Sequence, residues 1–450
     1  PYLQMTSSEA TTVRWRTDRP AECTLLVGPT SDDLTPAATS GPGMEHEVRI
    51  EGLTPATTMF YAIESDGAIL AGADDAHAFT TMPPTGSASP IRMWVLGDSG
   101  TADANARRVR DAYTARGDEA DLVLMLGDNA YNDGTDAEYQ AAVFDTYPEI
   151  LKRRPLWSTL GNHDGHTADS ATQTGAYFES FTFPRQAEVG GLASGTEAYY
   201  SFDVANVHFV CLDSYDTSRA AGDPMMTWLE QDLAQTSQTW IIAFWHHPPY
   251  SKGSHDSDRE RELIDMRRVA NPILEAAGVD LVLSGHSHSY ERSALIDGHY
   301  GTSDTFDPDT MRLDGGTGGP DDPYEKWQGV PHHGAVYAVA GSSGKISGGP
   351  LDHPVMVTNL NELGSMLIEV EGDRLEAIFL TDQGDVHDQF VIEKSPCPPD
   401  VVPDGVLDIF DLLGFLQWFS TLDSRADWNG DTAHDIFDAV AFLGDFDAGC

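Results

Sequence analysis

Five short polar motifs in the middle of the chain carry residue types that bind metal ions. They are Gly-Asp-Ser at 97–99, Gly-Asp-Asn-Ala-Tyr at 127–131, Gly-Asn-His-Asp at 161–164, His-His-Pro-Pro-Tyr at 246–250 and Gly-His-Ser-His at 285–288. Oxygen donors favour a harder metal ion, whereas imidazoles suit zinc or ferrous iron, so this mixture of groups suits a metal pair. Two ions roughly 3.5–4 Å apart activate a bound water and clamp the oxygens of a displacement at phosphorus. The motifs therefore predict hydrolysis of a phosphate ester.

Each motif follows an apolar run that is expected to form a buried strand. The runs are 91–96, 121–126, 156–160, 240–245 and 279–283. Continuous apolar stretches of this length are typical of a sheet that is covered on both faces. Because open α/β sheets place ligands at the carboxyl ends of their strands, the five motifs are expected to converge on one site.

Any one of these motifs alone is weak, because Gly-Asp and Asn-His pairs usually mark turns. The ordered series of five, each placed after a strand, favours a metal site. An alternative for Tyr131 is an aromatic side chain packed beside that site, and an alternative for His255 is a solvated loop histidine. His208, His353 and the pair at 332–333 are expected to be strand or loop residues without a chemical role.

The ordered motifs resemble those of the calcineurin-like metallophosphoesterases and, within them, the purple acid phosphatases. The tyrosine three residues after the aspartate at 127–131 distinguishes the purple subgroup, and residues 285–292 match its Gly-His-Ser-His-Ser-Tyr-Glu-Arg motif. The resemblance implies a dinuclear centre of Fe³⁺ with Zn²⁺, Mn²⁺ or Fe²⁺. The implied ferric ligands are Asp98, Asp128, Tyr131 and His288. The implied ligands of the second ion are Asn162, His246 and His286, with Asp128 as the bridge.

The resemblance also implies two catalytic histidines, His163 and His255, which would bind phosphate or protonate the leaving alkoxide. A positioned acid of this kind is worth roughly 10²–10⁴ in rate. His255 follows His246 by nine residues, as a catalytic histidine does in plant-like members of the family, although its loop is otherwise unlike theirs. Asp164 stands where many relatives have glutamate, and the shorter carboxylate is expected to alter how His163 is oriented.

Two linkers rich in proline and small residues, 82–90 and 393–399, divide the chain into three parts. Residues 1–82 alternate in polarity, which predicts a small all-β sandwich. The stretch 53–61 resembles the fibronectin type III pattern and the amino-terminal domain of plant-like purple acid phosphatases, with Met59 in place of the corner tyrosine.

Residues 90–394 are expected to form the catalytic domain. Its apolar runs alternate with helical stretches at 104–116, 136–144, 223–234 and 259–277, which predicts an α/β layered fold. The resemblance implies a metallophosphoesterase sandwich with two central sheets flanked by helices. The segment 300–334 is rich in Gly, Asp and Pro, and we expect an irregular loop there that borders the substrate pocket.

Residues 397–450 contain an internal repeat, in which 400–411 is matched by 427–438. Acidic residues at loop positions 1, 5, 9 and 12 offer oxygen ligands to Ca²⁺, and each loop precedes an apolar helical run. The predicted calcium ligands are Asp400, Asp404, Asp408, Asp411, Asp427, Asn429, Asp431, Asp435 and Asp438. This small α-helical calcium-loop pair resembles the dockerin modules of secreted bacterial proteins, which implies a protein or cell-surface partner. The alternative is a pair of acidic turns without metal.

The two calcium loops depart from the dockerin pattern at one position each. Val402 replaces a side-chain ligand in the first loop, and Thr432 replaces glycine in the second. The first loop is therefore expected to bind calcium more weakly.

Cysteine usage fits a secreted protein, and the charge bears on its partners. Cys397 and Cys450 bracket the last module and are expected to form a disulfide, whereas Cys23 and Cys211 fall in apolar runs and are expected to be buried thiols. Against 26 basic residues the chain has 72 acidic ones, a formal charge of −46, which disfavours nucleic acid as the main partner. No apolar run reaches the 18 or so residues that span a bilayer. Any signal peptide would precede residue 1 of this numbering.

The sequence thus predicts a secreted, extracellular or periplasmic dimetal phosphatase that acts on small phosphate monoesters. Because the acidic chain repels anionic esters, the metal pair must supply a local positive potential, helped by Arg292 or Lys345. Two alternatives remain open. One is a phosphodiesterase or nucleotidase with the same metal site, and the other is a non-catalytic surface or scaffold protein with a vestigial metal centre.

Overall fold

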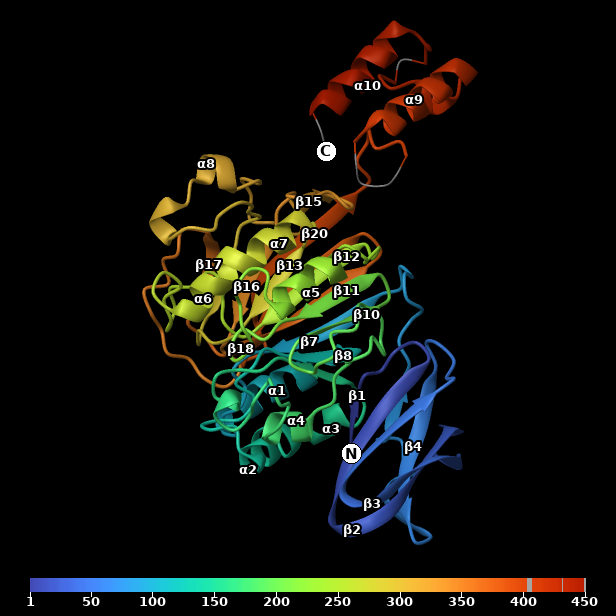
Figure 1. Ribbon diagram of the computed structural model, residues 1–450, viewed down its shortest axis with the longest axis vertical. Coiled ribbons are helices and arrows are strands. Elements are labelled where there is room, and N and C mark those ends of the chain that lie inside the picture. The colour runs from blue at the N-terminus through green and yellow to red at the C-terminus, as the bar shows by residue number, and fades with distance from the viewer. Residues whose placement is uncertain (403–406, 431, 449–450) are drawn as a thin grey trace.

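The computed structural model describes residues 1–402, 407–430 and 432–448. The chain begins with a six-stranded antiparallel sheet (Figure 1). Its strands are β1 (Tyr2–Gln4), β2 (Ala10–Thr30), β3 (Asp33–Glu51), β4 (Thr58–Ser65), β5 (Ala68–Gly72) and β6 (Ala78–Thr80). The long strand β2 pairs with β1, β3 and β4, and the unit encloses its own apolar core around Val13, Trp15 and Tyr61. This sheet-rich unit agrees with the all-β prediction, while the fibronectin type III likeness stays a prediction.

Several side chains of this first sheet donate hydrogen bonds to backbone carbonyls of the middle part of the chain, and three of them are buried. The Tyr2 hydroxyl bonds the carbonyl of Ser180 at 2.6 Å, and Nη2 of Arg14 bonds that of Glu179 at 2.6 Å. The Tyr61 hydroxyl reaches the carbonyl of Lys152 at 2.8 Å. The sheet therefore packs against the middle part of the chain through side chains that are themselves buried.

Two seven-stranded mixed sheets share one apolar core in the middle of the chain. The first sheet runs, in spatial order, β10 (Tyr200–Val204), β11 (Val207–Cys211), β12 (Trp240–Trp245), β13 (Leu281–Ser284), β16 (Val336–Ala340), β14 (Tyr290–Ser293) and β17 (Met356–Leu360). The second runs β15 (Tyr324–Trp327), β20 (Val386–Ser395), β19 (Arg374–Thr381), β18 (Gly364–Glu371), β7 (Ile91–Leu96), β8 (Leu122–Met125) and β9 (Leu156–Ser158). All five predicted strands are present, so the layered α/β prediction holds for this region.

Helices flank both sheets, as Figure 1 shows. On the side of β7 and β8 lie α1 (Ala104–Arg116), α2 (Asp136–Tyr139), the π-helix η1 (Gln140–Phe144), α3 (Pro148–Leu151), the 3₁₀ turn η2 (Asp164–His166) and α4 (Ala176–Ser180). On the side of β12 and β13 lie α5 (Pro224–Leu233), α6 (Arg261–Asp265), the π-helix η3 (Met266–Ala270) and α7 (Asn271–Ala276). Two of the four predicted helices thus contain a π-helical stretch, a feature that often occurs at functional sites. None of the helices in the described ranges is long and apolar enough to cross a membrane.

The helix α1 illustrates how local sequence sets an element's ends. The Asp103 side chain accepts hydrogen bonds from the backbone N–H groups of Asn105 and Ala106, which satisfies two donors of the first turn. Gly117 ends the helix with φ of 76°, a left-handed conformation that glycine adopts without a Cβ clash. The helix coincides with the predicted range 104–116, and it carries the chain from β7 to β8.

The segment 300–334 is more ordered than predicted. It contains the 3₁₀ turn η4 (Ser303–Thr305), the short helix α8 (Pro308–Met311) and the strand β15. Lys326 in β15 and Lys394 in β20 each place Nζ 2.8 Å from the buried carboxylate of Asp280, at the amino end of β13. Burial alone would raise the pKa of Asp280, but the two lysine charges outweigh it and lower that pKa. This ion triad joins the two sheets, and breaking a buried pair typically costs about 3–5 kcal/mol.

The last module consists of α9 (Ile409–Thr421), the 3₁₀ turn η5 (Ser424–Ala426) and α10 (Ile436–Ala448). Phe415 and Phe442, which are 27 positions apart, stack with ring centroids 4.1 Å apart. The predicted calcium ligands Asp404 and Asp431, and the expected disulfide partner Cys450, lie outside the described residues. The helical pair is present in the described ranges, while calcium binding stays a prediction.

Candidate metal centre

The strand ends of both sheets bring the predicted metal ligands to one place. β7, β8 and β9 are parallel and are followed by Asp98, Asp128 and Asn162. β12 and β13 are parallel in the other sheet and are followed by His246 and His286. The carboxyl ends of the two sets meet. Asp98, Asp128 and His246 each offer one possible ligand atom, and these three atoms all lie within 4.8 Å of one another.

Glycine makes this approach possible between the two sheets. A Cβ at Gly127 would lie 2.6 Å from Nδ1 of His246, and one at Gly161 would lie 2.1 Å from the backbone nitrogen of Asp128. Neither space accepts a side chain. The glycines that open the second and third motifs are therefore required by packing.

Three of the predicted ligands have a left-handed backbone. The φ angles are 55° at Asp98, 51° at Asp128 and 64° at His286. Residues other than glycine rarely adopt this conformation, and it persists where surrounding structure enforces it, frequently at functional sites. Here it turns each side chain from the end of its strand toward the shared centre.

The Asp98 carboxylate is fully buried and links the two sheets. Its Oδ2 accepts the backbone N–H of His286 at 2.7 Å, and its Oδ1 accepts the Tyr131 hydroxyl at 2.9 Å. Nε2 of His288 lies 3.4 Å from the same Oδ1. Burial raises the pKa of Tyr131 well above its usual value, and the charges of Asp98 and Asp128 raise it further. The phenol therefore keeps its proton unless a cation binds beside it.

Each of the three histidines predicted as ligands has one ring nitrogen held by an outer group. Nδ1 of His246 donates to the carbonyl of Leu126 at 2.8 Å, and Nδ1 of His288 is hydrogen-bonded to Ser347 Oγ at 2.8 Å. Nε2 of His286 faces Glu260 at 3.3 Å. The other nitrogen of each ring points into the centre. This is the arrangement in which an outer partner fixes the tautomer and orientation of a metal-binding imidazole.

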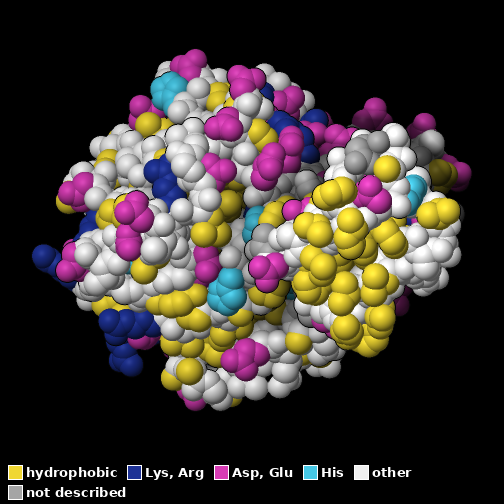
Figure 2. Space-filling model, turned by 90° about the horizontal axis from the view of Figure 1, so that it is seen from above, with side chains coloured by type: hydrophobic (Ala, Val, Ile, Leu, Met, Phe, Trp, Pro, Cys, Tyr) yellow, Lys and Arg dark blue, Asp and Glu magenta, His cyan; other side chains and the backbone are white. Residues whose placement is uncertain are grey.

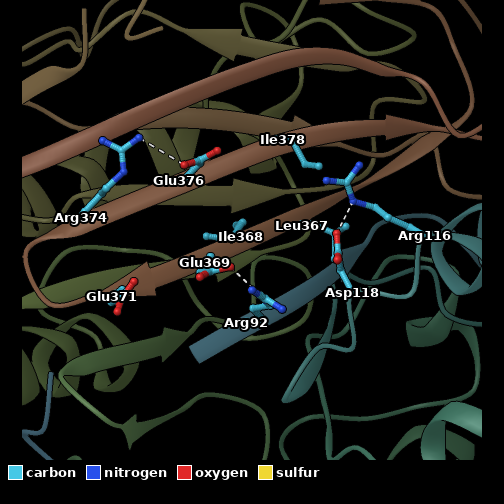
Figure 3. A pocket seen from close by; sticks show the side chains of 10 residues that line it. All are labelled: Arg92, Arg116, Asp118, Leu367, Ile368, Glu369, Glu371, Arg374, Glu376 and Ile378. Carbon is cyan, nitrogen blue, oxygen red and sulfur yellow. Dashed lines mark hydrogen bonds and ion pairs between the residues drawn. The ribbon is translucent and has the colours of Figure 1, made fainter. Parts of the chain in front are cut away.

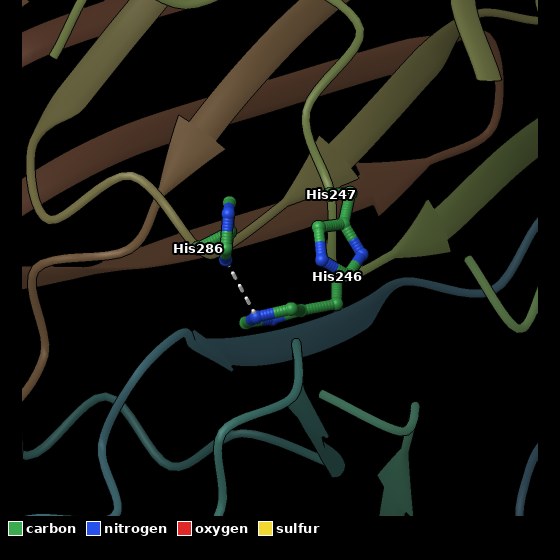
Figure 4. A group of neighbouring side chains, drawn as sticks. All are labelled: His246, His247 and His286. Atoms are coloured by element: carbon green, nitrogen blue, oxygen red, sulfur yellow. Dashed lines mark hydrogen bonds between the residues drawn. The ribbon is translucent and has the colours of Figure 1, made fainter. Parts of the chain in front are cut away.

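The inward nitrogens of His246 and His286 lie close together (Figure 4). Nε2 of His246 lies 3.2 Å from Nδ1 of His286 and 3.1 Å from Oδ1 of Asn162. It also lies 3.4 Å from Oδ1 of Asp128. His247, the neighbour not predicted as a ligand, is held at Nδ1 by Ser214 Oγ at 2.9 Å. Burial lowers the pKa of His247 well below its usual value, so this ring is neutral.

Glu260 is a residue of this site that the sequence reasoning missed. Its carboxylate accepts a hydrogen bond from Nδ1 of His255 at 2.9 Å and faces Nε2 of His286. Burial would raise the pKa of Glu260, but the two histidine hydrogen bonds outweigh it and hold that pKa far below its usual value. Glu260 follows no strand and belongs to no motif, and only its contacts with His255 and His286 reveal it.

The two predicted catalytic histidines flank the cluster. Nδ1 of His163 donates to the carbonyl of Asn132 at 2.5 Å, and its ring meets the Tyr131 ring edge-on at 4.6 Å. Its Nε2 lies 3.9 Å from Oδ2 of Asp128. The His255 ring lies against that of His286, with centroids 3.7 Å apart. Both side chains are about one-third exposed, 31 % and 30 %, so each can meet a ligand from solvent.

Asp164 does not contact His163 through its side chain. Instead its carboxylate accepts the backbone N–H of Gly161 at 2.9 Å, the Asn129 amide at 2.9 Å and the Tyr139 hydroxyl. Burial and the nearby charge of Asp128 raise the pKa of Asp164 to about 7. Asp164 thus holds the second and third motifs together.

The expectation that Arg292 supplies positive potential to the site is wrong. Arg292 is buried and forms a bidentate ion pair with Asp388, at 2.6 and 2.9 Å, so its charge is neutralised there. Lys345 remains as a basic residue at the centre, because its Nζ lies 5.9 Å from the centroid of the Tyr131 ring.

A pocket of about 320 Å³ on the outer face of β7, β18 and β19 does not compete as the functional site (Figure 3). Its walls carry the ion pairs Arg92–Glu369 at 2.5 Å, Arg116–Asp118 at 2.5 Å and Arg374–Glu376 at 3.2 Å. The three basic groups are already paired with acidic neighbours, so the pocket offers no unpaired cation with which to hold an anionic ester.

Comparisons with known proteins agree with this site. Residues 91–290 match the family model for the calcineurin-like phosphoesterases. Purple acid phosphatase 15 of Arabidopsis thaliana is 29% identical over 284 residues, which cover 56% of this chain and 50% of that protein. Purple acid phosphatase 21 of the same plant is 31% identical over 258 residues, 56% of this chain and 53% of that protein. The chain therefore spans about half the length of these curated relatives.

Two solved structures share the fold. Purple acid phosphatase PPD1 from yellow lupin (Lupinus luteus) seeds superposes with a TM-score of 0.68 at 17% identity, covering 88% of this chain and 74% of that one. PhoD superposes with a TM-score of 0.62 at 13% identity, covering 88% and 90%. Together the comparisons support a calcineurin-like metallophosphoesterase region similar to that of purple acid phosphatases.

The residues present fit a dinuclear metal centre. Seven donor side chains converge there, and the three imidazoles each direct one nitrogen inward while the other nitrogen is anchored. Carboxylate, phenol, amide and imidazole donors match the mixed chemistry that two first-row ions require.

Replacing Glu260 by Gln should weaken metal binding by about 10–100-fold, because the outer partner of His286 would lose its charge. Competition with a chelator, followed by elemental analysis, measures this. The control is Glu262→Gln, two residues further along α6, whose side chain faces Arg219 at 3.6 Å instead of the cluster. Unchanged metal affinity in Glu260→Gln would show that His286 is oriented without it.

Proposed function

We propose that this protein hydrolyses phosphate monoesters at a dinuclear metal centre, in the manner of an acid phosphatase. The observation that carries the proposal is the set of three anchored histidines around Asp98 and Asp128. Imidazoles held by outer partners beside buried carboxylates suit cation binding, whereas a purely structural core has no need of them. The likeness of residues 91–290 to calcineurin-like phosphoesterases supports phosphorus as the reacting centre.

We assign the two ions by donor type. Asp98, Tyr131 and His288 lie together and suit Fe³⁺, a hard ion that favours phenolate. Asn162, His246 and His286 suit Zn²⁺, Mn²⁺ or Fe²⁺, and Asp128 lies between the two groups. When bound, such a pair supplies an activated water and positive charge for in-line displacement at phosphorus.

The chain's own residues would bind the ester and move a proton. Nδ1–H of His163 donates a hydrogen bond to the carbonyl of Asn132. The protonated ring would then present Nε2–H to a phosphate oxygen or to the leaving oxygen. Nδ1 of His255 donates a hydrogen bond to the Glu260 carboxylate. Nε2 of His255 is then left to meet a phosphate oxygen or the leaving oxygen. Lys345 contributes a positive charge near Tyr131. Because the net charge is −46, these local groups are needed to draw an anion into the site.

We further propose that the last module binds calcium and docks onto a protein or cell-surface partner. The two repeats place equivalent carboxylates in equivalent bonds. Oδ1 of Asp411 accepts the backbone N–H of Val402 at 2.9 Å, and Oδ1 of Asp438 accepts that of Asn429 at 3.3 Å. Each carboxylate therefore binds the backbone near the start of its own loop, and carboxylate oxygens are the ligands that calcium prefers.

The outer faces of the two helices support the docking proposal. Figure 2 shows hydrophobic side chains gathered on this module. The exposed apolar residues repeat at an interval of 27 positions, namely Ile409, Phe410, Leu413 and Leu416 on α9, and Ile436, Phe437, Val440 and Leu443 on α10. Exposed apolar patches of this kind mark interaction sites. A secreted location, with calcium abundant outside the cell, completes this proposal.

Turnover of a nitrophenyl phosphate monoester should exceed that of the bis-nitrophenyl diester, and Asp128→Asn should abolish both. His163→Ala should lower kcat about 10²–10⁴-fold, because the proton donor is lost. His387→Ala, at an exposed histidine paired with Glu362, is the control. A preference for the diester would favour a phosphodiesterase, and an inert but fully metallated protein would favour a scaffold.

A purified holoenzyme should contain iron and show a visible charge-transfer band from tyrosinate to Fe³⁺. Tyr131→Phe should abolish the band, while Tyr215→Phe should keep it, because the Tyr215 ring stacks on His247, which is not a predicted ligand. The measurement is a visible spectrum with elemental analysis. A colourless, metallated enzyme without iron would refute the ferric assignment and leave the hydrolase proposal standing.

Calcium should bind the full chain at two loops of unequal affinity, with the first loop weaker because Val402 offers no side-chain oxygen. Asp427→Asn should weaken the tighter site by about tenfold or more, since it removes a ligand charge. Calorimetric titration measures both, with Asp447→Asn outside the loops as control. A titration without heat in the wild type would support the metal-free alternative.

A further inference from the structure

A second group of polar side chains is fully buried behind the loop that carries His246 and His255. We call Arg267, Asn271, His299 and His353 the buried cationic cluster. Their exposed fractions are 0, 0, 0 and 2 %. Each has at least one polar atom without a hydrogen-bond partner: Nε and Nη2 of Arg267, Oδ1 of Asn271, both ring nitrogens of His299 and Nε2 of His353. Buried polar groups are nearly always paired, so this concentration requires an explanation.

The four residues surround one aromatic side chain. The Tyr250 ring stacks on that of His299 at 5.5 Å and touches that of His353 at 5.5 Å. The two histidine rings are 6.2 Å apart. Nδ2 of Asn271 donates to the Tyr250 hydroxyl at 3.2 Å. Nη1 of Arg267 donates to the carbonyl of Pro249, the residue before Tyr250, at 3.0 Å, so the guanidinium lies next to the same segment.

Arg267 is a buried charge whose ion-pair partner among the described residues is distant and shared with a lysine. Its Nη1 donates to the carbonyls of Pro249 and Ser257 at 3.0 and 2.6 Å. Its nearest carboxylate, Asp258, lies 3.9 Å from Nη2 and is already bound by Lys252 at 2.8 Å. A buried charge is stable only when it is paired, because transfer from water costs several kcal/mol.

The two histidines present N–H donors beside that charge. The Val355 backbone N–H donates to Nδ1 of His353 at 3.4 Å, which leaves the proton of a neutral ring on Nε2. Burial lowers the pKa of His353 to about 3 and that of His299 to about 4. Both rings are therefore neutral at ordinary pH, and each offers an unpaired N–H group.

We propose that the buried cationic cluster binds a small monovalent anion of the halide class. Donors outnumber acceptors among the unpaired atoms. Of the four residues Arg267 carries the formal charge, and its ion pair with Asp258 is long, at 3.9 Å. A metal cation would be repelled by that guanidinium, although two imidazoles are at hand. A halide would accept N–H bonds from Arg267, His299 and His353 and would neutralise the buried charge.

The anion would act on the fold of the loop 246–258. Arg267 bonds this loop at Pro249, three residues after His246, and at Ser257, two residues after His255. A neutralised Arg267 would hold both points of the loop more firmly. Occupancy should therefore stabilise the part of the chain that presents these two histidines to the metal centre. This inference does not rest on the proposed hydrolase activity.

The test is a crystal of the full chain grown in bromide, together with thermal unfolding in chloride. We expect an anomalous bromide peak between Arg267, His299 and His353. Replacing sodium gluconate by sodium chloride at constant ionic strength and pH should raise the midpoint of unfolding by about 2–4 °C. His353→Leu should reduce this rise to zero, while His332→Leu, at an exposed histidine outside the cluster, should keep it.

The outcomes are distinct. Density at the cluster without an anomalous signal would mean ordered water and would overturn the proposal. A bromide peak with no chloride-dependent rise in the wild type would mean an adventitious ion only, which also overturns it. A rise that survives in His353→Leu would place the halide elsewhere, such as at the metal centre. If His353→Leu fails to fold, the bromide peak and the wild-type shift still decide.

Discussion

The structure depends on burying a group of carboxylates and imidazoles where the carboxyl ends of two sheets meet. Asp98 belongs to the second sheet, yet it accepts the backbone N–H of His286 from the first. The surrounding polar atoms are bonded outward to Leu126, Glu260 and Ser347. Burying such groups is tolerable only when they are bonded, and the inward atoms remain available for cations. The outer bonds therefore stabilise the fold and orient the donors at the same time.

The backbone around this group is strained for the same reason. Asp98, Asp128 and His286 adopt left-handed φ angles that most residues avoid. Relaxing these angles would turn the donors away from the centre. A side chain at the adjoining Gly127 or Gly161 would clash with the neighbouring motif. Apolar packing of both sheets in one core holds the chain in this arrangement. The buried Asp280 triad, at the opposite end of β13, closes the same pair of sheets.

Several expectations from sequence failed where long-range contacts decided. Arg292 belongs to the last motif, and only the fold reveals that Asp388 in β20 pairs with it and neutralises its charge. Residues 324–327 lie in a segment rich in turn formers, yet they form β15 because β20 offers a parallel partner. Glu260 has no motif around it, so its role could not be predicted. The helices expected at 136–144 and 259–277 are each interrupted by a π-helical stretch that their periodicity does not reveal.

The sequence by itself determined the five buried strands, the donor types at their ends and the repeat in the last module, because these follow from local hydrophobic pattern and side-chain chemistry. Tertiary structure alone decided which nitrogen of each histidine faces inward, which acid supports His286 and that Arg267 is buried beside Tyr250. Those features depend on contacts between residues that are far apart in the chain. No local pattern encodes such contacts, since two sheets must first pack before their strand ends can meet.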